Sequence, residues 1–248
     1  MSERGVSEVL SFTLVFALVV TSVAIVSVSG LGSLQDARDA EQLENAERAF
    51  DVLADNLADL HRQGAPSRAT EISLGQAQLA TEDNVTMTVR VEDSGGTTTV
   101  GTWEIRPLVY SGNQERELVY EAGAIFRTNR DSGFVVRDPP LVVDDDRVLL
   151  PVIGLNSPQV QSLGGSTVLV RATHREADVA FSRTDGSIES LTVEVASPRE
   201  AQWEQYFESH GFTCTGSAPI SCVYDPPPSD NFERVYIVYH DIGVVIDK

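Results

Sequence analysis

The stretch VLSFTLVFALVVTSVAIVSVSG, from Val9 to Gly30, decides how the chain is organised. It lies inside a longer region without charge that extends from Glu8 to Asp36. A transmembrane helix needs about 20 predominantly apolar residues, so the run is long enough to cross a bilayer. A buried helix of a soluble protein is the weaker alternative, because a soluble helix of this length normally shows a polar face. We therefore expect a membrane-spanning helix.

Three fates of this helix are open: an uncleaved anchor, a secretory signal peptide, or a helix that is retained after a short leader is removed. Ser27-Val28-Ser29 resembles the cleavage site of a signal peptide. The apolar run is nevertheless longer than the usual signal core of about 7–15 residues, and the leader at 1–5 carries only one Arg and one Glu. Arg4 and the α-amine carry positive charge on the short N-terminal side of the helix, which favours a cytoplasmic N-terminus and an extracytoplasmic C-terminal domain.

The composition is strongly acidic. The chain has 37 Asp and Glu residues against 18 Lys and Arg, which gives a net charge of −19, and its one lysine is Lys248. Concentrated salt screens the repulsion within such a surface, so this balance is typical of halophilic archaea. An acidic surface that binds a cation such as calcium is the alternative, but the acids are spread over the whole chain. Nucleic-acid binding needs a basic face, so we expect no nucleic-acid partner.

The helical periodicity continues beyond the apolar run. Apolar residues follow a heptad seam with spacings of three and four, at Leu43, Ala46, Phe50, Leu53, Leu57 and Leu60. We expect an amphipathic helix over 34–62 that ends at Gly64 and Pro66, a glycine cap followed by a proline. The seam either associates with other subunits or packs onto the chain's own domain, and it is too short to identify a coiled coil.

From about Thr70 onward the pattern changes to period two. Val85–Val91 alternates, and Ser94-Gly95-Gly96 predicts a hairpin turn before the next strand, 97–105. Further strands are expected at 118–120, 124–128, 134–137, 147–153, 167–174, 179–183, 190–195, 235–239 and 244–247. The fold class predicted is α+β: a long N-terminal transmembrane and amphipathic helix, then a mainly antiparallel, sandwich-like β-domain with one short helix. We expect three parts: a short leader at 1–5, the transmembrane helix with its amphipathic extension at 6–66, and an extracytoplasmic β-rich domain at 70–248.

The short helix is predicted from Pro198 to about Ser209, stopping at Gly211. Ser197-Pro198-Arg199-Glu200 has the pattern of a capping box with proline at the first helical position. Pro226-Pro227-Pro228 predicts a rigid exposed loop after it.

Two cysteines and one sequon point to an exported domain. Cys214 and Cys222 enclose a short loop, and we expect them to form one local disulfide that contributes about 2–3 kcal/mol. Without a paired histidine motif they make a poor zinc site. Asn84-Val85-Thr86 is a candidate N-glycosylation site at Asn84.

The N-terminal junction carries a resemblance to a known family. Arg4-Gly5 before Val6-Ser7-Glu8-Val9-Leu10 resembles the class III leader of archaeal type IV pilins, although Glu8 stands where Pro is often found. The resemblance implies that a prepilin peptidase cleaves between Gly5 and Val6. The order of helix, polar extension and β-domain, together with residues 45–56 and 64–68, also resembles a group of haloarchaeal pilin-like membrane proteins. That group has no assigned biochemical activity.

No catalytic motif is present: the chain lacks GxSxG, HExxH, a phosphate loop and a dinucleotide fingerprint. The four histidines, His61, His174, His210 and His240, have no ligand spacing, and we interpret them as surface or sheet-packing residues. Asp144-Asp145-Asp146 lacks the pattern of a calcium loop and predicts a solvated turn. We therefore expect no enzyme activity, no cofactor and no metal.

The hypothesis favoured by these observations is a non-catalytic pilin-like subunit or minor pilin of the cell membrane and surface. Its partners would be the membrane, a prepilin peptidase and other pilin-like subunits. The alternative is a single-pass membrane protein whose outer β-domain binds a cell-surface partner, such as an S-layer protein or an archaellum component. An extracytoplasmic enzyme is the third and weakest hypothesis.

Overall fold

The computed structural model describes residues 3–112, 116–130, 132–144, 146–157, 160–227 and 231–248. These residues form one long helix, α1 (Glu3–Gln63), a mainly antiparallel set of strands, and one short helix, α2 (Glu200–Ser209). The predicted fold class is confirmed. The chain divides into two compact units, Met1–Glu44 and Asn45–Lys248. The division falls inside α1, so residues 45–63 of the helix belong to the same unit as the strands.

Helix α1 continues through Gly30 and Gly32 without interruption. In its apolar part the hydroxyls of Thr13, Ser22 and Ser33 each donate to the carbonyl four residues earlier, at 2.8, 2.7 and 3.0 Å. Because these hydroxyls find acceptors on their own helix, they are compatible with a hydrocarbon environment.

The end of α1 follows the prediction. The helix stops at Gln63, and Gly64 takes the left-handed conformation, with a φ of 66°. The Ala65 N–H then donates to the Asp59 carbonyl at 3.2 Å, which satisfies one of the last free carbonyls of the helix. The glycine cap before Pro66 is confirmed.

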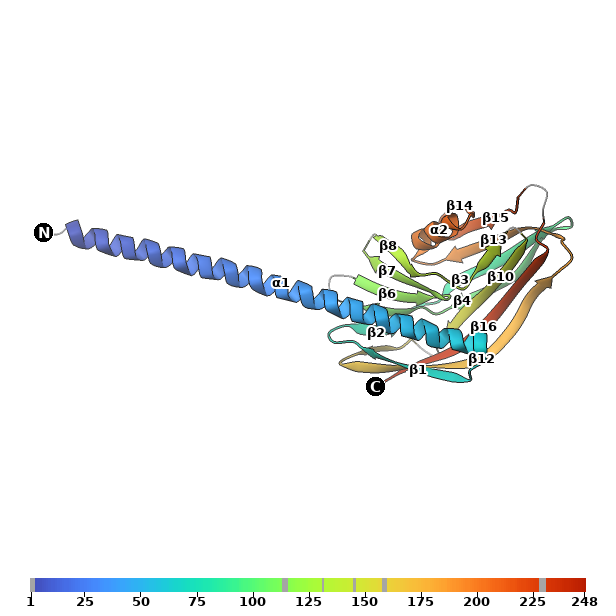
Figure 1. Ribbon diagram of the computed structural model, residues 1–248, viewed down its shortest axis with the longest axis horizontal. Helices are drawn as coiled ribbons and strands as arrows, with labels where there is room; N and C mark the ends of the chain where they lie inside the picture. Colours follow the sequence, from blue (N-terminus) through green and yellow to red (C-terminus); the bar gives the residue numbers. More distant parts are fainter. Residues whose placement is uncertain (1–2, 113–115, 131, 145, 158–159, 228–230) are drawn as a thin grey trace. The chain divides into compact units, whose positions relative to one another are not determined.

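Three sheets follow α1 (Figure 1). The first has the strand order β1 (Ser67–Ser73), β12 (Thr167–Arg183), β16 (Arg234–Asp247), β10 (Arg147–Asn156), β9 (Val142–Asp144). The second is β11 (Ser162–Gly164), β2 (Gln78–Thr81), β5 (Leu108–Ser111), β6 (Arg116–Glu121), β7 (Ala124–Asn129), β8 (Ser132–Arg137). The third is β14 (Thr213–Thr215), β15 (Ile220–Tyr224), β13 (Ile188–Ala196), β3 (Val85–Asp93), β4 (Gly96–Ile105). The pairing of β10 with β16 is parallel.

Two predicted breaks are wrong, because β12 and β16 each run through them. The expected strands 167–174 and 179–183 are one strand, in which the register with β16 shifts at Arg175 and again at Ala180. The expected strands 235–239 and 244–247 are likewise one strand. Gly243 does not end β16: the Arg175 side chain of β12 lies where a Cβ at Gly243 would stand. This glycine therefore permits the close approach of a neighbouring side chain.

The β3–β4 hairpin is confirmed. Side chains of β3 alternate between buried and partly exposed from Val85 to Val91. Asp93 pairs with Gly96, so the turn is Ser94–Gly95, and the Gly95 N–H donates to Asp93 Oδ1 at 2.8 Å.

The β-domain has two apolar layers, because β6 is buried on both faces. Val119 belongs to a cluster with Val193 and Trp203. Its neighbours Leu118 and Tyr120 are buried outside that cluster, on the opposite face of the strand.

Five residues of the α1 seam are buried as well, each at most 1% exposed: Ala46, Phe50, Leu53, Leu57 and Leu60. The Phe50 ring meets Tyr110 of β5 edge to face, with 6.4 Å between ring centroids. This part of the seam packs inside the chain's own domain.

Polar contacts line the flanks of the seam. Arg68 binds Asp59 at 3.0 Å, Arg127 binds Glu47 at 3.4 Å, and Arg137 binds Asp55 at 2.6 Å. In each case an acidic residue of α1 meets an arginine of a strand. The Asn56 amide also donates to Thr70 Oγ1 at 2.8 Å.

The predicted capping box of α2 is wrong. The helix begins at Glu200, two residues later than expected, and its N-cap Arg199 makes no side-chain capping bond. Ser197 Oγ accepts from the Arg199 N–H at 3.0 Å, while the Glu200 carboxylate accepts from the Ala218 N–H at 2.9 Å. The motif has the right residues, but each side chain makes a tertiary or turn contact instead.

Candidate functional site

The apolar segment of α1 is the largest exposed hydrophobic surface of its unit. Every large apolar side chain from Val9 to Leu34 is at least half exposed. By length and composition this is a helix that can cross a membrane. Phe12 and Phe16 stack along one side, with ring centroids 6.1 Å apart. An aqueous environment would leave all of this surface unfavourably hydrated.

The predicted cleavage junction lies at the start of the same helix. The backbone of Gly5 and Val6 is helical, because α1 begins at Glu3. Met1 and Ser2 of the expected leader lie outside the described residues. Three residues, Val6 to Glu8, separate the junction from the apolar segment, and cleavage there stays a prediction.

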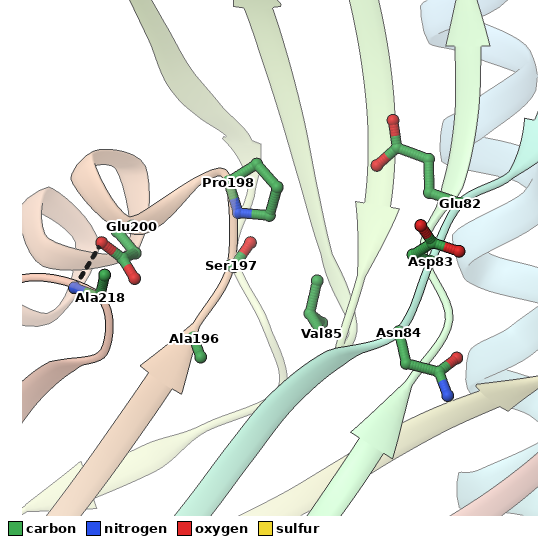
Figure 2. A pocket seen from close by; sticks show the side chains of 9 residues that line it. All are labelled: Glu82, Asp83, Asn84, Val85, Ala196, Ser197, Pro198, Glu200 and Ala218. Atoms are coloured by element: carbon green, nitrogen blue, oxygen red, sulfur yellow. Dashed lines mark hydrogen bonds between the residues drawn. The ribbon is translucent and has the colours of Figure 1, made fainter.

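An open cavity of about 580 Å³ lies between the start of β3 and the start of α2 (Figure 2). Its lining combines acids with small and apolar side chains: Glu82, Asp83, Asn84, Val85, Ala196, Ser197, Pro198, Glu200 and Ala218. Two of its three carboxylates have structural partners. Glu82 binds Arg199 at 2.9 Å, and Glu200 accepts from the Ala218 N–H, the bond drawn in Figure 2. These two groups hold the walls of the cavity together.

The sequon residue Asn84 lies on the rim of this cavity. Its side chain is exposed, and its amide donates to Glu104 Oε2 of β4 at 2.8 Å. The next residue, Val85, is buried in the apolar cluster and pairs with Ile105. Asn84 thus lies just before β3, whose first two residues complete the sequon, and glycosylation of Asn84 stays a prediction.

A buried ion network adjoins the cavity through Glu82, and no sequence pattern predicted it. Arg199 donates to Glu121 at 2.8 Å and to Glu82 at 2.9 Å, and Trp203 Nε1 donates to the other oxygen of Glu121 at 2.7 Å. Arg199 and Glu121 are almost completely buried. Burial alone would lower the pKa of Arg199, but the two carboxylates outweigh it and raise this pKa above its ordinary value. Arg199 Nη2 is buried without a hydrogen-bond partner among the described residues.

The network joins three elements that are distant along the chain. Glu82 follows β2, Glu121 ends β6, and Arg199 precedes α2. The sequence pattern placed Arg199 in a helix cap, and its partners are distant along the chain. Only tertiary structure could reveal this contact.

Three of the four histidines come together, although they are distant in sequence. His61 of α1 lies 5.3 Å from His240 of β16, and His174 of β12 lies 6.4 Å from His240, measured between ring centroids. Burial, followed by the charges of His240 and Arg62, lowers the pKa of His61 to about 4. Burial and His174 also lower the pKa of His240, whose Nδ1 is buried without a partner among the described residues. The imidazoles of His61 and His240 therefore favour their neutral form. The fourth, His210, is exposed beside Tyr206.

The remaining sequence candidates are structural. Cys214 and Cys222 form a disulfide that joins the paired strands β14 and β15. Asp144 and Asp146 bind Arg147 and Arg234, at 2.7 and 3.3 Å, and Asp145 lies outside the described residues. Within the described part of the chain, no group of three or more His, Cys, Asp or Glu side chains is arranged to hold a metal ion.

Comparison with known proteins gives one match. No curated protein and no solved structure matches the chain. A family of unknown function, DUF7289, matches residues 4–245, a span that includes the apolar helix and nearly all of the β-domain. The chain therefore belongs to the DUF7289 family.

Proposed function

We propose that the chain is a non-catalytic, pilin-like surface subunit that its N-terminal helix anchors in the membrane or assembles with other subunits. A prepilin peptidase cleaves it between Gly5 and Val6 and leaves the apolar helix on the mature protein. The β-domain lies outside the cell, where its acidic surface keeps it soluble in concentrated salt.

The observation that carries this proposal is the division of α1. From Val9 to Leu34 the helix exposes apolar side chains all round, whereas from Ala46 to Leu60 it is part of the core of the β-domain. Cleavage after Ser29 would leave these core residues in place, but the apolar run is longer than the usual signal core of about 7–15 residues. A retained helix accounts for both parts.

The non-catalytic role is supported by the use of the buried polar groups. The charged side chains beside the cavity, Glu82, Glu121 and Arg199, bind one another. The lowered pKa values of His61 and His240 favour neutral rings that pack against each other. Neither arrangement brings a nucleophile next to a base.

The experiment that tests the proposal is identification of the N-terminus of the mature protein by mass spectrometry. Protein from native membranes and from sheared cell-surface material would be compared. We expect the mature chain to begin at Val6 in both fractions. A Gly5→Leu variant should retain residues 1–5, while a Ser2→Leu variant, as the matched control, should be processed normally.

The outcomes separate the remaining hypotheses. An intact leader in the unmodified protein, with none of it in sheared material, would replace the proposal by a plain single-pass protein that binds a surface partner. A mature chain that begins after Ser29 would instead identify a signal peptide and contradict both.

A further inference from the structure

The outer edge of the third sheet has an unusual composition. β4 pairs with β3 on one side and with none of the described strands on the other (Figure 1). Its first residues, Gly96-Thr97-Thr98-Thr99, are all exposed. An unpaired edge presents backbone N–H and C=O groups that another strand can bind. Threonine favours the strand conformation, so this segment is ready to pair.

The other described sheet edges are short, charged or covered. β9, β11 and β14 have three residues each. β1 carries Arg68 and Glu71, and β8 has the Gln202 side chain of α2 against Gly133. β12 is free beyond the end of β1, but it carries Arg175, Glu176 and Asp178 there. Charge and short length are the usual protection against edge-to-edge association.

We propose that residues 96–99, here called the β4 edge, pair antiparallel with the β4 edge of a second copy of this chain. The two third sheets would then form one continuous sheet across a twofold axis. In such an isologous contact the same residues meet from both sides. This inference goes beyond the proposed function, because it concerns the β-domain and is independent of how the N-terminus is processed.

Charge is the reason that the partner is a second copy. Two chains of net charge −19 repel each other wherever their acidic surfaces meet. The β4 edge has no charged side chain. The nearest acids in the register, Glu92 and Asp93, are on β3. Across the joint, the two β3 strands would lie three strand spacings apart, about 14 Å, which exceeds the screening length of about 8 Å at physiological salt.

Side-chain chemistry also suits a copy of itself. On its inner side β4 already makes such a contact, between Thr88 Oγ1 and Thr102 Oγ1 at 3.0 Å. Antiparallel pairing of two β4 edges would place threonine opposite threonine, a favourable cross-strand pair. Four residues form a small contact, so its occupancy depends on the high local concentration of membrane-anchored chains.

Cysteine cross-linking of the full chain in membranes tests this pairing. The described cysteines are both in the disulfide, so an introduced cysteine is the only free thiol. Thr97→Cys, Thr98→Cys and Thr99→Cys would be oxidised mildly, one at a time, and dimers detected on a non-reducing gel. Val179→Cys is the matched control, since Val179 is well exposed on the free, charged part of β12.

We expect one of the three positions to give several-fold more dimer than Val179→Cys, with less dimer at the positions on either side. Adding Thr98→Lys to a Thr97→Cys or Thr99→Cys chain should abolish the dimer, whereas adding Thr98→Val should keep it. Equal cross-linking at Val179 and at the three threonine positions, no cross-linking at all, or cross-links only to a different protein would overturn the proposal.

Discussion

The two parts of α1 differ in how many apolar residues they have and in how these are arranged, and that difference determines what each part contacts. From Val9 to Leu34 apolar residues surround the helix and are exposed. From Ala46 to Leu60 they form one stripe with acids beside it, and the stripe is buried in the β-domain. A helix that is apolar all round needs an apolar environment, whereas an amphipathic helix can bury its stripe against a soluble domain. One continuous helix therefore serves two environments.

The largest expected effect comes from truncating the buried stripe. Leu57 is completely buried, so Leu57→Ala should lower the free energy of unfolding by about 2–5 kcal/mol through lost contacts and a cavity. Leu18→Ala, the same change in the exposed part, should leave the unfolding of the β-domain within about 0.5 kcal/mol of the unmodified chain. Denaturant unfolding in detergent, followed by tryptophan fluorescence, measures both. Equal losses would show that the two parts are not distinct.

A charge in the exposed part tests its membrane role. Leu18→Arg places a guanidinium near the middle of the apolar run, which disfavours membrane insertion by about 2.5–3.5 kcal/mol. We expect less of this variant in washed membranes, while its unfolding stays normal. Val52→Arg is the matched control, since Val52 is exposed on the second part of the helix. If Leu18→Arg and Val52→Arg remain in membranes equally, the apolar run is not the anchor.

Acid should lower the free energy of unfolding through His61, which lies at the end of the buried part of α1. Folding lowers the pKa of His61 from 6.5 to about 4. Between these two pH values the unfolded chain binds a proton at His61 that the folded chain does not bind. This penalty is absent above pH 6.5, grows as the pH falls from 6.5 to 4, and then levels off. Because His61 is partly exposed, we expect a loss of about 1–2 kcal/mol over this window.

The matched pair for this prediction is His61→Gln and His210→Gln. The first should make the fall in unfolding free energy between pH 6.5 and 4 shallower, because the suppressed imidazole is gone. The second removes the exposed imidazole at the C-cap of α2 and should leave the fall unchanged. Identical pH profiles for His61→Gln and the unmodified chain would rule out a role for this histidine.

Local sequence patterns were sufficient to predict the elements that depend on neighbouring residues. The apolar run, the end of α1 at Gly64 and the β3–β4 hairpin all depend on neighbouring residues, and all three are observed as expected. The breaks expected in β12 and β16 were wrong because register shifts at Arg175 and Ala180 keep the two strands paired, and Gly243 makes room for the Arg175 side chain. The short strands β2, β9, β11 and β14 are too brief to show a period.

The polar clusters could not be predicted for a different reason. Arg199 finds Glu121 and Glu82 across 78 and 117 positions of the chain, and the His61–His240 contact joins the end of α1 to the last strand. No spacing rule covers such distances. The local motif even pointed elsewhere, because Ser197 and Glu200 form a good capping box in sequence. The parts of the site that depend on sheet topology could therefore not be predicted from the sequence.

The smallest expected effect concerns the ion pairs that flank the buried stripe. Arg137 binds Asp55 at 2.6 Å, but the Asp55 side chain is 70% exposed, so the pair should contribute only about 0.2–1 kcal/mol. A double-mutant cycle with Arg137→Ala and Asp55→Ala measures the coupling, and the exposed pair Arg147–Asp144 of β10 and β9 is the control. Both couplings should shrink as salt is raised, because salt screens exposed charges. A salt-resistant coupling as large as the loss in Leu57→Ala would mean that charge, and not the apolar stripe, holds the helix to the β-domain.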